Sequence, residues 1–149
     1  MSIENAIDAQ ARELGINLTP SVPGYLNLCV RTGNLYLTSG HTSTITGKLG
    51  AELTVEDGQH AAVEAIKGLL ASVHAAHGSL AGLKVVRLMA CVNATPDFTE
   101  HGVVINGASD LIHTLFGQEL GYHARSALGF SSIPGGAAVE IEAIIEILS

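Results

Sequence analysis

The sequence predicts a single α+β domain with elements in the order ββαβαββ, preceded by an N-terminal helical extension. Residues 139–147 alternate between apolar and mostly acidic side chains, which is typical of a half-buried strand. Residues 54–78 repeat apolar side chains at intervals of three and four, which is typical of an amphipathic helix. Strands grouped in pairs, with helices between them, predict one mixed sheet with two helices packed on one face.

The N-terminal third of the chain contains an expected helix and an expected hairpin. A serine cap and a closing glycine favour a helix over residues 2–15, and prolines mark residues 19–24 as a linker. Residues 25–30 and 35–40 are expected to be strands, joined by a turn at residues 31–34.

The middle of the chain predicts a helix, a strand and a second helix. Thr54 begins the first helix and Gly78 ends it. Residues 84–94 are apolar on both faces, which is typical of a central strand that is covered on both sides. Residues 103–116 predict a second long helix that Gly117 closes.

The last two strands are expected to form a hairpin. Residues 124–132 and 137–147 flank Pro134-Gly135-Gly136, and these residue types favour a chain reversal. In a chain this short, covering both faces of one sheet suggests help from another subunit, so an oligomer is expected.

Bulk composition limits the classes of function. The 149 residues suit a single domain, 1–149, of which 1–24 form the extension and linker. A net charge of −7, 4% aromatic residues and no tryptophan argue against nucleic acid and anionic membranes as partners. No apolar run reaches the roughly 20 residues needed to cross a bilayer, and residues 1–15 do not resemble a signal peptide. A cytoplasmic protein is expected.

Cysteines and histidines give no strong indication of a metal site. Cys29 and Cys91 are far apart in sequence and are expected to be reduced, buried thiols. His74 and His77 have the i, i+3 spacing of helical metal ligands, but a solvated helix end explains them better because no third ligand is evident. We therefore expect no metal.

Arg125 is the strongest single candidate for a binding residue. It lies at the start of a strand of small and apolar residues, where a guanidinium could grip a carboxylate with two nitrogens. The alternative is a structural ion pair with Glu146, which the expected hairpin register places nearly opposite. Glu140 is a weaker candidate, because acidic neighbours on its face favour a solvated strand surface.

Several segments resemble the RidA/YjgF family of enamine/imine deaminases, over about residues 25–147. The matching motifs are Ala124-Arg125-Ser126-Ala127-Leu128, Ile133-Pro134, residues 139–144, residues 31–40, and residues 92–98 with Asn106. The resemblance implies a chorismate-mutase-like fold and a homotrimer with active sites in the clefts between subunits. It also implies a small carboxylate or imino-acid substrate and no metal or organic cofactor.

The same resemblance implies roles for individual residues. Arg125 corresponds to the family arginine that binds the substrate carboxylate, and Glu140 to the glutamate that positions or activates water. The residues expected to line the cleft are Tyr25, Ser39, Gly40, Asn106 and Ala127, the last through its backbone carbonyl. His41 and His123 stand where the family usually has glutamine and proline, which suggests a paralogous branch.

The expected function is hydrolysis of a reactive 2-imino acid to its 2-oxo acid and ammonia. Two alternatives remain open: a non-catalytic binder of small carboxylates, and an endoribonuclease, against which the acidic composition argues. On a regular hairpin, Glu140 would lie opposite Ser131 and about 20 Å from Arg125. Either the strand is bulged or bent, or the two residues meet across a subunit boundary.

Overall fold

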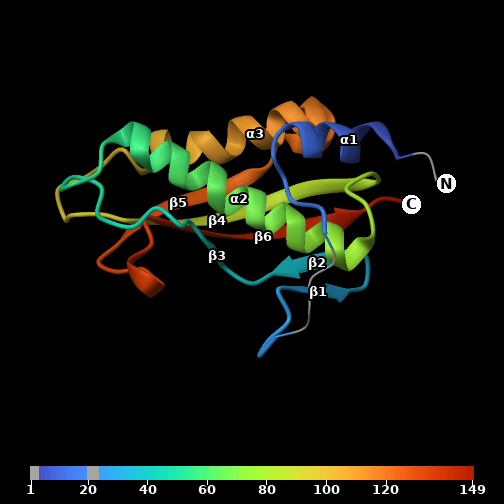
Figure 1. Cartoon of the computed structure of the whole chain (residues 1–149), viewed down its shortest axis with the longest axis horizontal. Helices are drawn as coiled ribbons and strands as arrows, with labels where there is room; N and C mark the ends of the chain where they lie inside the picture. The colour runs from blue at the N-terminus through green and yellow to red at the C-terminus, as the bar shows by residue number, and fades with distance from the viewer. Residues whose placement is uncertain (1–3, 20–23) are drawn as a thin grey trace.

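The chain folds into one mixed β-sheet that carries its helices on a single face (Figure 1). A computed structural model describes residues 4–19 and 24–149. Its elements are α1 (Ala6–Glu13), β1 (Cys29–Thr32), β2 (Leu35–Thr38), β3 (His41–Thr42), α2 (Val55–His77), β4 (Leu83–Asn93), α3 (His101–Gly121), β5 (Ala124–Phe130), the 3₁₀ turn Pro134–Gly136 and β6 (Val139–Ile147). The predicted α+β fold is thereby confirmed, with β3 as an additional short strand.

The strands lie in the order β1-β2-β6-β4-β5, and β3 pairs with β6. β4 runs antiparallel to β6 and parallel to β5, so it is the central strand that its two apolar faces predicted. β1 and β2 form the expected N-terminal hairpin.

The expected C-terminal hairpin is wrong. β5 and β6 do not pair with each other, because β4 lies between them and pairs with both. The Pro-Gly-Gly segment forms a 3₁₀ turn within a longer connection that crosses the end of β4. The proposed ion pair of Arg125 with Glu146 is also wrong, since Glu146 lies opposite Lys84 and Leu35 on other strands.

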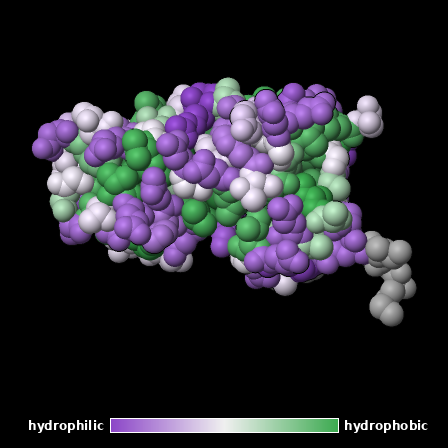
Figure 2. Space-filling model, turned by 90° about the horizontal axis from the view of Figure 1, so that it is seen from above, coloured by the Kyte–Doolittle hydropathy of each residue, from purple (hydrophilic) through white to green (hydrophobic). Residues whose placement is uncertain are grey.

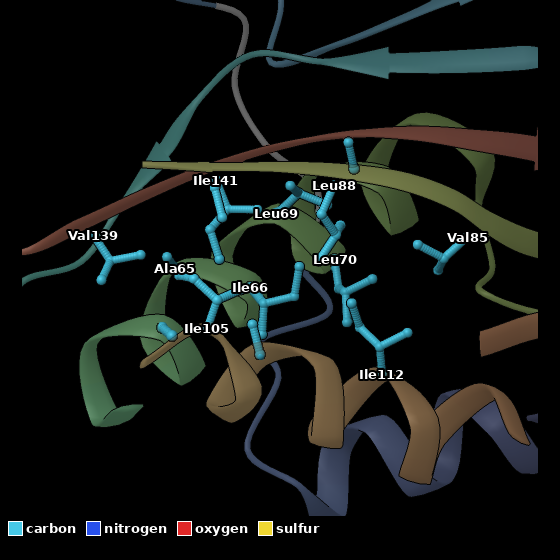
Figure 3. Packing of buried hydrophobic residues seen from close by; sticks show 14 of the residues in the cluster. Ala65, Ile66, Leu69, Leu70, Val85, Leu88, Ile105, Ile112, Val139 and Ile141 are labelled. Atoms are coloured by element: carbon cyan, nitrogen blue, oxygen red, sulfur yellow. The ribbon is translucent and has the colours of Figure 1, made fainter. Parts of the chain in front are cut away.

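The hydrophobic core lies between the sheet and the helices α2 and α3 (Figure 3). Ile66, Leu69 and Leu70 of α2 and Ile105 and Ile112 of α3 are all fully buried. They meet side chains of one sheet face; those labelled in Figure 3 are Val85, Leu88, Val139 and Ile141. At about 25 cal/mol per Å² of apolar surface, this burial is the main stabilising contribution to the fold.

The helix boundaries follow local signals. Thr54 and Asp57 form a capping box at the start of α2, and Gly78 ends the helix at a φ of 89°. α3 continues to Gly121, but Gly117 interrupts it at a φ of 74°, so the predicted stop is a kink followed by a last turn. The predicted cap at Ser2 lies outside the described residues; Asn5 caps α1 through Asp8 N.

The face of the sheet opposite the helices carries exposed apolar side chains. Val30 and Leu37 pair across β1 and β2, and Leu128 lies on the same face of β5; each is more than 40% exposed. The helix side, seen in Figure 2, shows hydrophilic side chains spread among smaller hydrophobic patches. None of the helices in the described part of the chain has the length and apolar character needed to cross a membrane.

Candidate functional site

Arg125 lies on β5 and directs its side chain toward α3. Its neighbour in the sheet is Leu88, which is fully buried under the helices, so both residues point to the helix face. Nη1 donates to Ser109 Oγ at 2.9 Å; Nη2 donates to Asn106 Oδ1 at 2.9 Å and to the Gly102 carbonyl at 3.1 Å. We call Arg125, Asn106, Ser109 and Ala127 the arginine cluster.

No carboxylate forms a salt bridge with Arg125 among the residues that the structure describes. Its three acceptors are a hydroxyl, an amide and a backbone carbonyl. Because a guanidinium stays charged at all ordinary pH values, this half-buried cation has an unfilled capacity for an anion.

Ala127 lies two residues after Arg125 and points to the same face of the sheet. The Phe130 carbonyl accepts a hydrogen bond from Ala94 N on the β4 side. Backbone groups alternate between the two edges of a strand, so the Ala127 carbonyl points to the free edge of β5. Since β5 is the last strand of the sheet, this carbonyl is open to a ligand or a second subunit.

A cavity of about 500 Å³ lies at the C-terminal end of β5, and none of the four residues of the arginine cluster is among those that line it. His101, which precedes Gly102 on α3, and Gly129, two residues after Ala127, both line it. A side chain at position 129 would collide with His101, because an added Cβ would lie 2.4 Å from His101 Nε2. Phe98 and Phe130 supply apolar walls, so the cavity suits the side chain of a small organic molecule.

Glu140 lies on the opposite face of the sheet from Arg125. It pairs with Cys91 of β4, three residues beyond Leu88, and alternation along β4 puts the two positions on opposite faces. A bulge in β4 between Val85 and Arg87 does not change this assignment. Within one chain, Arg125 and Glu140 therefore do not share a site.

Glu140 has its own surroundings, which we call the glutamate cluster: Glu140, Gly40, Ser39 and Cys91. A cavity of about 220 Å³ is lined by Gly40, Glu140 and Cys91, among others. Gly40 allows this close approach, because an added Cβ would lie 2.5 Å from Glu140 Oε1. Ser39 Oγ donates to the Asn27 carbonyl at 2.9 Å, which fixes the chain just before Gly40.

The remaining predicted residues lie apart from Arg125. Tyr25 is fully exposed, ahead of β1. His41 directly follows Gly40, but it pairs with the fully buried Ile141 and its side chain is buried on the helix face of the sheet. Its Nδ1 lies 2.8 Å from the Ser39 carbonyl, and its Nε2 lies 2.8 Å from Ser72 Oγ of α2. Burial lowers the pKa of His41, although its hydrogen bond to Ser39 acts in the other direction.

The cysteines are free thiols, as expected, but both are half-buried rather than buried. Burial raises the pKa of Cys29 to about 11. Burial, with smaller effects of Glu140 and Glu142, also raises the pKa of Cys91. Both thiols therefore stay protonated near neutral pH and are poor nucleophiles. Across residues 4–19 and 24–149, no three histidine, cysteine or acidic side chains come together as metal ligands.

Sequence reasoning missed Ser109 and gave His123 no role. Ser109 follows Asn106 by three residues, so both lie on the α3 face that meets Arg125. His123 lies 3.0 Å from Ser109 Oγ through its Nε2. The i, i+3 spacing of Asn106 and Ser109 was the available signal.

Comparisons with known proteins show the family and the fold of the chain. A family model described as Endoribonuclease L-PSP matches residues 17–147. The chain belongs to this family, which includes YjgF and RidA.

Individual members of the L-PSP family resemble the chain over different lengths. Protein TCP17 of Trypanosoma cruzi is 49% identical over 104 residues, which cover 69% of this chain and 65% of that protein. A crystal structure from Agrobacterium tumefaciens, of unknown function, is 38% identical with a TM-score of 0.84, covering 95% of this chain and 92% of that one. A putative endoribonuclease from Shewanella oneidensis is 26% identical with a TM-score of 0.85, covering 96% and 100%. The family and fold are shared, whereas these names do not agree on one activity.

Proposed function

We propose that this protein hydrolyses 2-imino acids to 2-oxo acids and ammonia, at a site built by two subunits. The observation that supports this most is Arg125, a half-buried cation whose described hydrogen-bond partners are all neutral oxygens. A guanidinium so placed suits a carboxylate, and the resemblance of the sequence to the RidA/YjgF enamine/imine deaminases suggests an imine as the reacting group.

The substrate carboxylate would bind Arg125 by displacing one of its present partners. Nη2 already directs both of its N–H groups to Asn106 and Gly102. A guanidinium can bind both oxygens of a carboxylate through Nε and Nη2 or through Nη1 and Nη2, so either mode uses Nη2. Two-nitrogen binding therefore exchanges one of these acceptors, and we assign that role to the Asn106 amide, because a side chain can rotate away whereas the Gly102 backbone cannot.

Glu140 of a neighbouring subunit would hold the attacking water. Water would add to the carbon of the protonated imine while one of its protons passes to the Glu140 carboxylate, which gives a neutral carbinolamine. The glutamate would then give this proton to the nitrogen. As the C–N bond breaks, the hydroxyl becomes the carbonyl of the 2-oxo acid, and its proton passes through the carboxylate to ammonia, which leaves as ammonium. Proton transfer by a positioned side chain contributes roughly 10²–10⁴-fold to a rate.

A homotrimer would bring the two clusters together. The free edge of β5 and the exposed apolar face of the sheet are both available for a partner, and the two clusters lie on opposite faces of one chain. A site completed by a second copy explains both facts. No nucleic acid or cofactor takes part in this proposal, and a cytoplasmic location would suit it because amino-acid metabolism produces such imines.

The proposal is tested by imine turnover. We would generate 2-iminopropionate in situ with an amino-acid oxidase and follow its decay with wild type, Arg125→Lys and Glu140→Gln. We expect wild type to accelerate decay and both variants to lose most of the effect, because lysine lacks the planar fork and glutamine cannot take a proton. Arg12→Lys is a matched control, since Arg12 is a surface residue whose side chain pairs with Glu4.

A second candidate function is carboxylate binding without catalysis. It is favoured if the chain acts alone, because Arg125 and Glu140 then face opposite sides of the sheet. Pyruvate binding that depends on Arg125, together with no imine turnover by the folded oligomer, would select it. Cleavage of RNA by wild type, with no effect on imines, would select the nuclease activity that the family description names.

A further inference from the structure

A chain of hydrogen bonds connects Arg125 to the backbone at the end of α3. Arg125 Nη1 lies 2.9 Å from Ser109 Oγ, Ser109 Oγ lies 3.0 Å from His123 Nε2, and His123 Nδ1 lies 2.6 Å from the Gly121 carbonyl. Ser109 is only 5% exposed and His123 is half-buried. The chain therefore runs mostly out of contact with water.

The chemistry of the two ends fixes the direction of every bond in this chain. The Gly121 carbonyl can only accept, so His123 carries a proton on Nδ1. In a neutral imidazole Nε2 is then an acceptor, and it receives the hydroxyl proton of Ser109. Ser109 Oγ keeps its lone pairs for Arg125, which can only donate. Bonds aligned in one direction polarise and strengthen each other.

The surroundings of His123 favour its neutral form. Burial lowers the pKa of His123, and His113 and Arg125 lower it further, against an opposing effect of the Gly121 hydrogen bond. The centroid of the His113 ring lies 5.4 Å from that of the His123 ring and 4.1 Å from that of the Tyr122 ring. Among the described residues, no carboxylate takes part in the hydrogen bonds that connect Arg125, Ser109 and His123.

We propose that Ser109 and His123 are positioning residues for the carboxylate site, which hold Nη1 of Arg125 while Nη2 exchanges Asn106 for the substrate. The hydroxyl of Ser109 fixes the plane of the guanidinium, and His123 fixes the hydroxyl. The ligand is a 2-oxo or 2-imino carboxylate. This inference rests on the proposed carboxylate site, but the hydrogen-bond chain can be tested without turnover.

The first test measures ligand affinity and catalysis in hydroxyl variants. We expect Ser109→Ala to weaken pyruvate binding and raise KM by about tenfold, while kcat changes little, because a hydrogen bond to a charged group is lost and Glu140 is untouched. Ser109→Thr keeps the hydroxyl and should retain most of the affinity. The control is Thr114→Val, which removes an exposed hydroxyl from the same helix. Equal affinities for wild type and Ser109→Ala would overturn the proposal.

The second test reads the proton of His123 by ¹⁵N NMR at neutral pH, without substrate. We expect the Nδ1–H form in wild type, and a mixture of the two forms in Ser109→Ala. A wild-type proton on Nε2 would overturn the proposal even if a variant at position 109 failed to fold. Failure of the proposed function would give a different result. In that case wild type would not turn over imines, although His123 would still carry its proton on Nδ1.

Discussion

At the scale of single residues, Arg125 combines a fixed charge with partners that a ligand can replace. Its contacts hold the side chain in place but do not neutralise it. A surface arginine such as Arg12 instead pairs with a carboxylate in water, where the pair contributes little. Arg125 therefore retains most of its electrostatic attraction for an anionic ligand.

Two histidines, the buried His41 and the half-buried His123, make the stability of the fold sensitive to acid. The pKa values of His41 and His123 are lowered in the folded state, mainly by burial. The unfolded chain takes up protons first as the pH falls through about 6.5. The stabilisation is therefore complete above that pH and is lost as the pH falls toward the folded-state values.

We expect the free energy of unfolding to decrease between about pH 7 and pH 5, measured by urea titration, and to decrease less steeply in His41→Gln. His60→Gln is the control, because His60 is an exposed residue of α2. An unchanged slope in His41→Gln would contradict the assignment of this effect to His41.

At the scale of elements, glycines determine how closely the helices α2 and α3 approach. A Cβ added at Gly107 would lie 2.4 Å from the Gln59 carbonyl oxygen, which is backbone and cannot rotate away. At Gly68, also within a helix, the nearest atom would be His41 Cδ2 at 3.9 Å. Both glycines are helical, but only Gly68 has room for a side chain.

We expect Gly107→Ala to destabilise the protein by about 1–3 kcal/mol and Gly68→Ala to stabilise it by up to about 1 kcal/mol. The first variant forces α2 and α3 apart, whereas the second only restricts the unfolded chain and improves helix propensity. Thermal unfolding measures both. Equal effects of the two substitutions would show that the close contact at Gly107 is unimportant.

Element positions were predictable where the signals are local. The capping box of Thr54 with Asp57 and the closing Gly78 define α2, and two apolar faces identify β4 as central. The partner of β5 was not predictable from the turn at Pro134. β4 pairs with β5 on one edge and with β6 on the other, and this pairing depends on contacts far from the turn. That error also hid the opposite faces of Arg125 and Glu140.

At the scale of the whole molecule, the described part of the chain leaves one face of the sheet without a covering helix. Val30, Leu37 and Leu128 are exposed there, and the glutamate cluster lies on the same face. Burial of this face between subunits would remove apolar surface from water and would leave Glu140 near a neighbour. The sequence predicted this need for a cover from the small size of the chain.

We expect Leu37→Lys to dissociate the proposed trimer into monomers in sedimentation-velocity experiments, because an unpaired charge in an apolar interface costs several kcal/mol. Ala76→Lys, on the exposed side of α2, is the control and should leave assembly unchanged. A Leu37→Lys protein that sediments like wild type would contradict an interface on this face.

The division of the site between subunits is tested most directly by mixing two inactive chains. We would co-express Arg125→Ala with Glu140→Gln in equal amounts, purify the mixed oligomers and measure imine turnover. If each site takes Arg125 from one subunit and Glu140 from the next, about a quarter of the sites regain both residues. We therefore expect about a quarter of wild-type turnover. Mixed oligomers as inactive as either variant alone, beside an active wild type, would show that Arg125 and Glu140 do not act across a subunit boundary and would contradict a site shared between subunits.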